Sequence, residues 1–129
     1  MTATPPLALE ILCDAWALIE DPARWCQGEY ARDADGRSAN PHDPRVPRRC
    51  AAGALYRANP LLTGAYTATE IARDGYRLHY GALNALGDAA RALYSQNIPA
   101  VNDDLGHAAV ERCYALAVAV VAKDGEELT

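Results

Sequence analysis

The stretch that decides the fold is WCQGEYARDADGRSANPHDPRVPRRCAAGAL, residues 25–55. It lies between two segments with helical patterns and is polar and rich in turn residues over most of its length. Asp35-Gly36 is a favourable tight-turn pair, because glycine accepts a positive φ and aspartate bonds its own backbone. We therefore predict a small β-hairpin near residues 28–40, with short strands at Tyr30-Ala31 and Ser38-Ala39.

The second half of this stretch leads into a helix. Three prolines in NPHDPRVP, residues 40–47, exclude a helix there and favour an extended, solvent-exposed path. The next helix is expected to begin at Arg48 or Cys50 and to end at Asn59-Pro60. Gly53 inside it costs about 1 kcal/mol relative to alanine, and is tolerated if another backbone approaches closely.

A helix over residues 6–20 precedes the hairpin. It is predicted from apolar residues at three- and four-residue steps. These residues are Leu9, Leu12, Trp16 and Ile19. Asp21 and Pro22 follow, and they suit the cap and the first position of a further helical turn.

Further helices are expected downstream. Thr67 and Glu70 have the spacing of a capping box, which predicts a short helix over 68–74. A longer helix follows, with one apolar face formed by Leu83, Leu86, Ala90 and Leu93. The segment QNIPAVNDDLG, residues 96–106, is predicted to be a loop, and the last helix is expected over 107–122.

Residues 115–122 are apolar on every side of that last helix. Such a helix usually lies at the centre of a domain or is covered by a partner chain. We expect central burial, because monomers rarely expose large apolar patches, and keep a homodimer through this helix as the alternative. The patterns together predict a mainly α fold over residues 1–129, a single compact domain of about four or five helices with the hairpin inserted.

Composition argues against several classes of protein. The formal net charge of −5 disfavours a broad phosphate-binding surface, so nucleic-acid binding is not expected. The first residues lack the basic segment of a signal peptide, and the longest apolar run, residues 114–122, is too short for a bilayer. We therefore expect a cytoplasmic protein that does not enter a membrane.

Four cysteines in a cytoplasmic chain should be reduced thiols. Their spacing contains no C-x-x-C pair and no close histidine, so a zinc site is a minor alternative and no cofactor is expected. Cys13 and Cys113 are expected to be inert, buried thiols.

Cys50 is the most reactive-looking thiol in the sequence. It lies near a predicted helix N-terminus and follows Arg48 and Arg49, and both features favour the thiolate and could lower its pKa. A nucleophile also needs a base, which His42, His79 or His107 would supply only by folding onto it. We favour the alternative that Cys50 opens the buried face of its helix, because nothing in the spacing pairs it with a histidine.

The acidic and basic clusters have ordinary interpretations. DADGRSANPHD superficially resembles a calcium loop, but its glycine comes too early and no glutamate stands at the twelfth position. Among Asn102, Asp103 and Asp104, one residue is expected to cap the last helix. The arginines of RVPRR, residues 45–49, are expected to form a solvated face, with phosphate or an acidic partner as the alternative.

Three blocks of sequence resemble a known family when they are taken together. They are W-x-Q-G-x-Y-A-R-D-x-D-G over 25–36, C-x-x-G-A-L over 50–55 and N-D at 102–103. Their order and spacing are similar to those of an uncharacterised family of small bacterial and phage proteins, which carries a domain-of-unknown-function label. The resemblance implies no activity, but it implies a candidate binding or structural cluster of Trp25, Gln27, Gly28, Asp33, Gly36, Cys50, Gly53, Asn102 and Asp103.

The familiar phosphate-loop, dinucleotide, esterase and zinc-protease signatures do not occur in the sequence. We therefore expect a small protein-interaction or regulatory protein without catalytic activity, acting on a protein partner. The alternative is a small enzyme or ligand-binding protein with a site near Cys50 and Asn102-Asp103. An acidic inhibitor that mimics nucleic acid is a weaker alternative, because arginines are mixed among the carboxylates.

Overall fold

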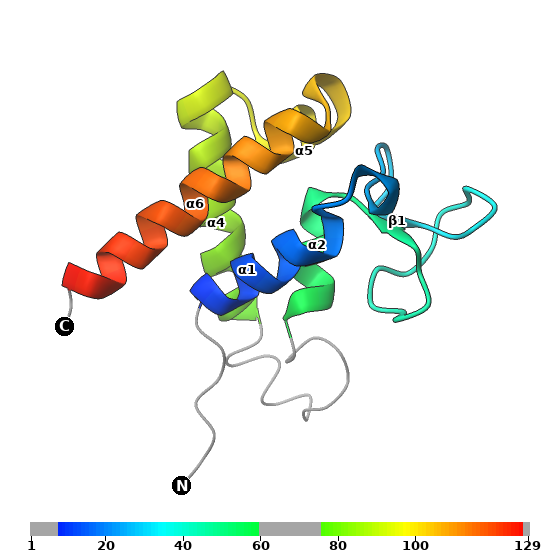
Figure 1. Cartoon of the computed structure of the whole chain (residues 1–129), viewed down its shortest axis with the longest axis horizontal. Helices are drawn as coiled ribbons and strands as arrows, with labels where there is room; N and C mark the ends of the chain where they lie inside the picture. The colour runs from blue at the N-terminus through cyan, green and yellow to red at the C-terminus, as the bar shows by residue number, and fades with distance from the viewer. Residues whose placement is uncertain (1–7, 60–75, 128–129) are drawn as a thin grey trace, which may run out of the picture.

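The computed structural model describes residues 8–59 and 76–127, and these residues are mainly helical (Figure 1). The described elements are α1 (Ala8–Ile19), η1 (Pro22–Arg24), β1 (Ala31–Arg32), β2 (Arg48–Arg49), α2 (Ala51–Ala58), α4 (Tyr76–Tyr94), α5 (Ile98–Ala100), η4 (Val101–Leu105) and α6 (His107–Glu127). The mainly α fold with a small antiparallel hairpin is thus confirmed. The short helix expected over 68–74, with its capping box at Thr67, lies outside the described residues.

Helix α1 lies against α2, α4 and α6. It buries Ile11, Leu12, Ala15 and Ile19, which follow the predicted periodicity. Cys13 is exposed, so the prediction that it is buried is wrong. Cys13 stands beside the exposed Asp14 on the outward face of the helix, since neither belongs to the apolar stripe. The helical turn after α1 is confirmed, because the Asp21 carboxylate accepts the Ala23 N–H at 2.9 Å.

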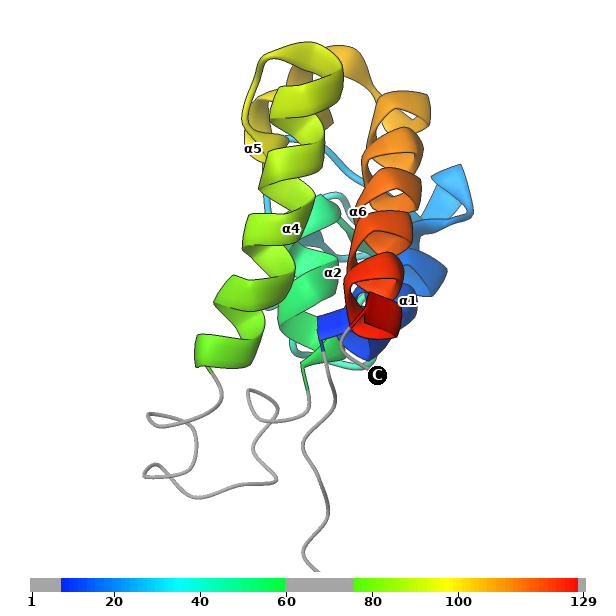
Figure 2. The ribbon, with the colours of Figure 1, turned by 90° about the vertical axis from the view of Figure 1, so that its left-hand side faces the viewer.

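Helix α4 crosses α6 and packs against it (Figures 1 and 2). Its buried face carries mostly small residues, namely Ala82, Leu86, Ala89 and Ala90. Leu93 is 44% exposed, so its predicted place on the apolar face is wrong. Alanines allow α4 and α6 to approach closely, and the buried stripe passes through Ala89 and Ala90 instead of Leu93.

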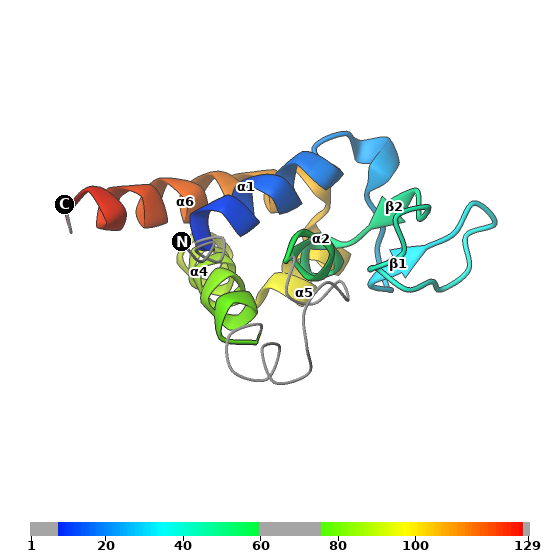
Figure 3. The same ribbon diagram turned by 90° about the horizontal axis from the view of Figure 1, so that it is seen from below.

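Helix α6 buries one face and exposes the other. Val110, Cys113, Tyr114 and Ala117 belong to the core, which confirms the buried thiol at Cys113. Exposed residues on the opposite side include Ala115, Ala119 and Val120. Central burial is therefore the wrong prediction for α6, because α6 lies along one side of the described fold and extends past α1 (Figure 3).

The hairpin turns where the sequence predicts. The Gly36 N–H donates to the Asp33 carbonyl at 3.0 Å, and Gly36 has a φ of 83°. The second strand of the sheet comes later than expected: β1 pairs antiparallel with β2, and Ser38 makes only a single bridge to Arg32. The proline-rich return carries the chain back so that β2 lies beside β1 and leads directly into α2.

Residues 96–106, predicted to be a loop, are largely helical. Asn97 caps α5, since its side-chain oxygen accepts the Ala100 N–H at 2.9 Å. Pro99 does not prevent α5 from forming, because proline is tolerated in the first turn of a helix. Burial of Ile98 and Val101 ties α5 and η4 to the core. Among the described residues, no helix is both long and apolar enough to span a membrane.

Candidate functional site

Asn102 is the centre of a hydrogen-bond network that joins three distant segments. It is 2% exposed. Its Oδ1 accepts the Trp25 Nε1–H at 2.7 Å and the Ala51 N–H at 2.9 Å. Its Nδ2 donates to the Cys26 carbonyl at 3.0 Å and to Asp103 Oδ1 at 3.0 Å. Because an asparagine amide offers two donors and two acceptor lone pairs, every bond it can make is made, and its orientation is fixed.

Residues 27 and 28 complete this connection. Gln27 Nε2 donates to the carbonyls of Asn102 at 3.1 Å and Asp103 at 3.0 Å. The Gly28 N–H donates to Asp103 Oδ1 at 2.9 Å, and Gly28 has a φ of 81°, which favours glycine. Asn102 and Asp103 are therefore held on the segment that follows η1.

In this network the Asn-Asp-Asp segment, residues 102–104, has a different role from the predicted one. We expected Asn102, Asp103 or Asp104 to cap the last helix. Asn102 instead accepts the first N–H of α2, and Asp103 accepts a loop N–H. Each of these bonds joins residues more than fifty positions apart, so a local capping rule does not predict them.

Cys50 is the N-cap of α2, and its Sγ accepts the Gly53 N–H at 3.3 Å. The lowered pKa that the reactive-thiol alternative requires is absent. Burial raises the pKa of the Cys50 thiol above its ordinary value, and the negative charge of Asp103 adds to the rise. The N–H groups of Gly53 and Ala52 act in the opposite direction on this pKa and do not overcome the burial.

The arginines of RVPRR do not surround Cys50, and they do not form a uniformly solvated face. Arg49 is 6% exposed, and its guanidinium donates to the carbonyls of Pro41 at 2.8 Å and Asp43 at 2.7 Å. Arg48 donates to the Asp33 carbonyl at 3.2 Å. Only Arg45 remains an exposed side chain paired with Asp43. Arg49 therefore holds the proline-rich loop through its carbonyl oxygens, whereas Arg48 holds the hairpin turn.

The histidines considered as bases for Cys50 contact other groups. The His42 ring packs edge-on against Tyr56, with centroids 5.7 Å apart. His107 Nε2 lies 2.7 Å from the Ile19 carbonyl, and its ring contacts Trp25 at 5.4 Å between centroids. The His79 side chain lies outside what the structure describes.

The remaining cluster residues stand apart from the Asn102 network. Asp33 and Gly36 form the hairpin turn, where the Asp33 carboxylate accepts the N–H groups of Asp35 and Arg37 at 2.9 Å each. Gly53 lies directly beneath the Tyr30 carbonyl, and a Cβ added to it would collide with that oxygen. The close backbone approach expected at Gly53 is therefore present.

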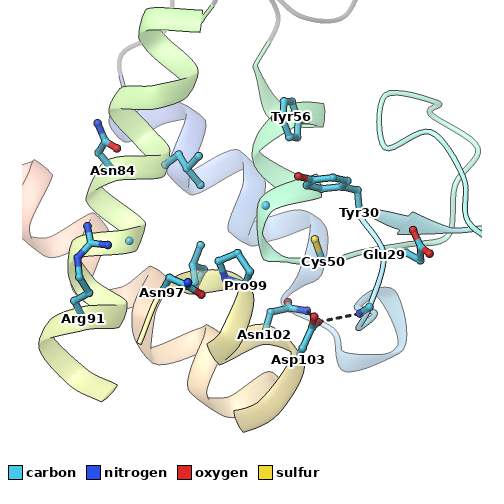
Figure 4. Close-up of a pocket in the computed structure, with 15 residues that line it drawn as sticks. Glu29, Tyr30, Cys50, Tyr56, Asn84, Arg91, Asn97, Pro99, Asn102 and Asp103 are labelled. Atoms are coloured by element: carbon cyan, nitrogen blue, oxygen red, sulfur yellow. Dashed lines mark hydrogen bonds between the residues drawn. The ribbon is translucent and has the colours of Figure 1, made fainter. Parts of the chain in front are cut away.

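A pocket of about 410 Å³ opens beside this network, between α2, α4, α5 and the segment 28–30 (Figure 4). Its apolar wall consists of Tyr30, Tyr56, Leu83, Ile98 and Pro99. Of the predicted cluster, Gly28, Cys50, Asn102 and Asp103 line it, whereas Trp25, Gln27, Asp33, Gly36 and Gly53 do not.

Sequence reasoning missed the α4 side of this pocket. Asn84, Gly87 and Arg91 all line it, and they are spaced by three and four residues along the helix. This spacing places them on one face. The polar residues Asn84 and Arg91, seven positions apart and therefore on one face of the predicted helix, were the signal available in the sequence.

The charges of the pocket are separated. Glu29 and Asp103 lie on the side of the hairpin, whereas Arg91 lies across from them on α4 (Figure 4). Arg91 is paired with Asp88 at 2.9 Å. Within residues 8–59 and 76–127, no three His, Cys, Asp or Glu side chains are grouped so that they would hold a metal ion.

Comparison with known proteins identifies a family but gives no activity. No curated protein and no solved structure matches the chain. The model of a "Family of unknown function (DUF6197)" matches residues 3–120, which is most of the sequence. The chain therefore belongs to this family of unknown function.

Proposed function

We propose that this protein is a cytoplasmic binding protein, and that the pocket between α2, α4 and α5 holds a small-molecule ligand. The observation that carries the proposal is the pocket itself, with a volume of about 410 Å³. Ligand sites typically enclose about 300–1,000 Å³ and combine an apolar lining with a few polar groups. The free thiols at Cys13, Cys26, Cys50 and Cys113 fit a reducing compartment.

The Asn102 network supports this proposal, because it fixes one side of the pocket before any ligand arrives. Asn102 joins the segment after η1 to the first turn of α2 through two buried bonds and one half-buried bond. Asp103, which lines the pocket, is held by the Gly28 N–H. A preformed site binds more tightly than a flexible one, because less conformational entropy is lost on binding.

The state of Cys50 favours binding over thiol catalysis at this pocket. Thiolates are the nucleophilic form of cysteine. Burial raises the pKa of Cys50, so its thiol is protonated at neutral pH. Its sulfur already accepts the Gly53 N–H as a helix cap. The role of Cys50 in the pocket wall is then structural.

The test fills the pocket from two opposite walls. Ala52→Phe projects from α2, and Gly87→Leu projects from α4, where a Cβ would meet only the Arg91 guanidinium at 3.6 Å or more. Ala92→Phe, on the exposed side of α4, is the matched control. Circular dichroism checks that each variant is folded.

Ligand-observed saturation-transfer NMR with a fragment set gives the readout. We expect fragments that bind the native protein and the Ala92→Phe control to lose their signals with both pocket-filling variants. If folded Ala52→Phe and Gly87→Leu bind the same fragments as the native protein, the pocket is not the binding site and the proposal is wrong.

A second candidate function, protein interaction through α6, is favoured by the outer face of that helix. Val120 is 48% exposed, and Ala115 and Ala119 in the same part of the helix are also exposed. An antiparallel pairing of two such faces would make a homodimer. Sedimentation velocity tests this: Val120→Lys should convert a dimer to a monomer, and a native protein that is monomeric at all concentrations contradicts it.

A further inference from the structure

We propose that the ligand of the pocket has a flat aromatic body, which packs against the Tyr30 ring and reaches the backbone of α4 at Gly87. This inference rests on the proposed function and names the chemical class of its ligand. Two features of the pocket wall carry it. One is an exposed ring held in an ordered row of aromatic side chains, and the other is a helix glycine that the packing of the protein does not require.

Tyr30 brings an exposed aromatic ring to the pocket. It lines the pocket and is 54% exposed. Its ring meets that of Tyr56 edge to face, with centroids 5.6 Å apart and planes at 89° (Figure 4). Tyr56 meets the His42 ring in the same way, at 5.7 Å and 78°. Aromatic pairs are more favourable than their buried area alone accounts for, so an aromatic ligand would extend this row at its exposed end.

The backbone that carries the Tyr30 ring is fixed before a ligand binds. The Tyr30 carbonyl accepts the Cys50 N–H at 3.0 Å. The same carbonyl lies so close to Gly53 that a Cβ there would collide with it. Because Tyr30 is held against the start of α2 by these contacts, its ring loses little conformational entropy when a ligand packs on it.

Gly87 lines the pocket from the interior of α4, where a glycine costs about 1 kcal/mol relative to alanine. Its φ is not positive, so the backbone conformation does not require glycine. Within the described chain, a Cβ at this position would meet only the Arg91 guanidinium, at 3.6 Å or more, which is ordinary van der Waals contact. A ligand that lies against the helix backbone does require glycine, because a side chain would hold it away.

The rest of the lining favours an apolar body between these two contacts. The lining charges are engaged with the protein: Arg91 is paired with Asp88 at 2.9 Å, and Asp103 accepts the Gly28 N–H at 2.9 Å. The apolar lining comes from α2, α4 and α5, namely from Ala52, Leu83, Ile98 and Pro99. Burial of apolar surface on this wall then provides the affinity, and the Tyr30 ring provides the preference for an aromatic body.

The test uses two probes that share one carbon frame and one hydroxyl group. 2-Naphthol is flat and aromatic, whereas decahydro-2-naphthol is saturated and puckered, and both are uncharged at neutral pH. Affinities come from ¹H–¹⁵N chemical-shift titrations of the whole chain. We expect 2-naphthol to bind roughly three- to tenfold more tightly. Hydrophobic burial alone predicts the opposite order, because the saturated probe has the larger apolar surface.

Tyr30→Leu tests the ring contact, because it removes the aromatic ring and keeps an apolar side chain. It should weaken 2-naphthol binding roughly three- to tenfold and change the affinity of decahydro-2-naphthol less than about twofold. Tyr94→Leu is the matched control, because Tyr94 lies at the end of α4 and does not line the pocket. Its preference for 2-naphthol should equal that of the native protein.

Gly87→Ala tests the contact with the backbone of α4. The added methyl group should weaken 2-naphthol binding roughly fivefold or more, because it occupies the place of the ligand. Gly81→Ala, in the same helix but outside the pocket lining, is the matched control and should leave binding unchanged. Both substitutions should raise the melting temperature through helix propensity, so lost stability would not explain weaker binding by Gly87→Ala.

The outcomes separate the two proposals. If decahydro-2-naphthol binds as tightly as 2-naphthol, and Ala52→Phe abolishes binding of both, the pocket is a ligand site but not a site for an aromatic body. If neither probe binds in a way that Ala52→Phe and Gly87→Leu abolish, the aromatic proposal fails together with the proposed function. A preference for 2-naphthol that persists in Tyr30→Leu, or native affinity in Gly87→Ala, also overturns the proposal.

Discussion

The indole Nε1–H of Trp25 donates to Oδ1 of Asn102 over 2.7 Å, although the two residues are 77 positions apart in the sequence. The same oxygen accepts the Ala51 N–H, so one buried amide connects the chain after η1, the start of α2 and η4. The pocket wall formed by Asp103 and Cys50 lies beside this amide. Fold stability and pocket geometry are therefore coupled through Asn102.

Replacing Asn102 should destabilise the protein strongly. Asn102→Ala leaves the Trp25 indole, the Ala51 N–H and the Cys26 carbonyl without their partner, and each unsatisfied buried group costs about 1–3 kcal/mol. We expect the free energy of unfolding to fall by about 3 kcal/mol or more in urea titrations. Asp104→Ala, at the exposed neighbouring position, is the control and should change it by less than about 0.5 kcal/mol.

Two glycine-to-alanine substitutions should act in opposite directions. Gly53→Ala places a methyl group against the Tyr30 carbonyl, so the hairpin must move away from α2. We expect a loss of about 2 kcal/mol or more. Gly81→Ala in α4 meets only the Ala8 methyl at 4.0 Å and should add up to about 1 kcal/mol through helix propensity. Thermal unfolding measures both, and a neutral Gly53→Ala contradicts the close approach.

Thiol labelling should single out Cys13. Iodoacetamide reacts with exposed thiolates, and Cys13 is exposed whereas Cys26 and Cys113 are buried. Burial also raises the pKa of Cys50. At pH 8 we expect mass spectrometry to show Cys13 alkylated well before the other three, and all four alkylated in urea. Cys50 reacting as fast as Cys13 would restore the reactive-thiol interpretation.

Stability should fall in alkaline solution, partly through Cys26. Burial raises the pKa of Cys26 from 9.0 to about 11, and its thiol donates to the Glu29 carbonyl at 3.5 Å. The folded state therefore favours the neutral thiol. This contribution is complete below pH 9 and is lost as the pH rises towards 11. Urea unfolding between pH 7 and 11 should show the decline, and Cys26→Ala should make it shallower; an equally steep decline in that variant contradicts this assignment.

The sequence predicts those parts of the fold that depend on local patterns. Apolar periodicity places α1 and α4, and Asp35-Gly36 places the hairpin turn, because these features depend on neighbouring residues only. The strand partner of β1 was placed too early, since a long proline-rich return separates the two strands and pairing across it is not local. Burial of Arg49 was missed for a similar reason: its partners are backbone carbonyls of a loop, which no residue pattern reveals.

The candidate site could be predicted only in part. The candidate cluster implied by the family resemblance includes Cys50, Asn102 and Asp103, which the structure places in one pocket wall. The sequence did not predict that Asn102 would accept the first N–H of α2, because an Asn-Asp-Asp segment before a helix is typical of a cap. The opposite wall, with Asn84 and Arg91, depends on how α4 rotates against α2, and tertiary packing determines that rotation.

A chemical-shift map of fragment binding tests the central claim most directly. ¹⁵N-labelled protein is titrated with a fragment that gives a saturation-transfer signal, and backbone and side-chain amide shifts are assigned to residues. Binding in the pocket predicts the largest changes at Gly28, Gly87 and the side-chain amides of Asn84 and Asn97, all of which line it, with loss of these changes in Ala52→Phe. Shifts confined to the outer face of α6, or no saturable shifts at all, would contradict the account.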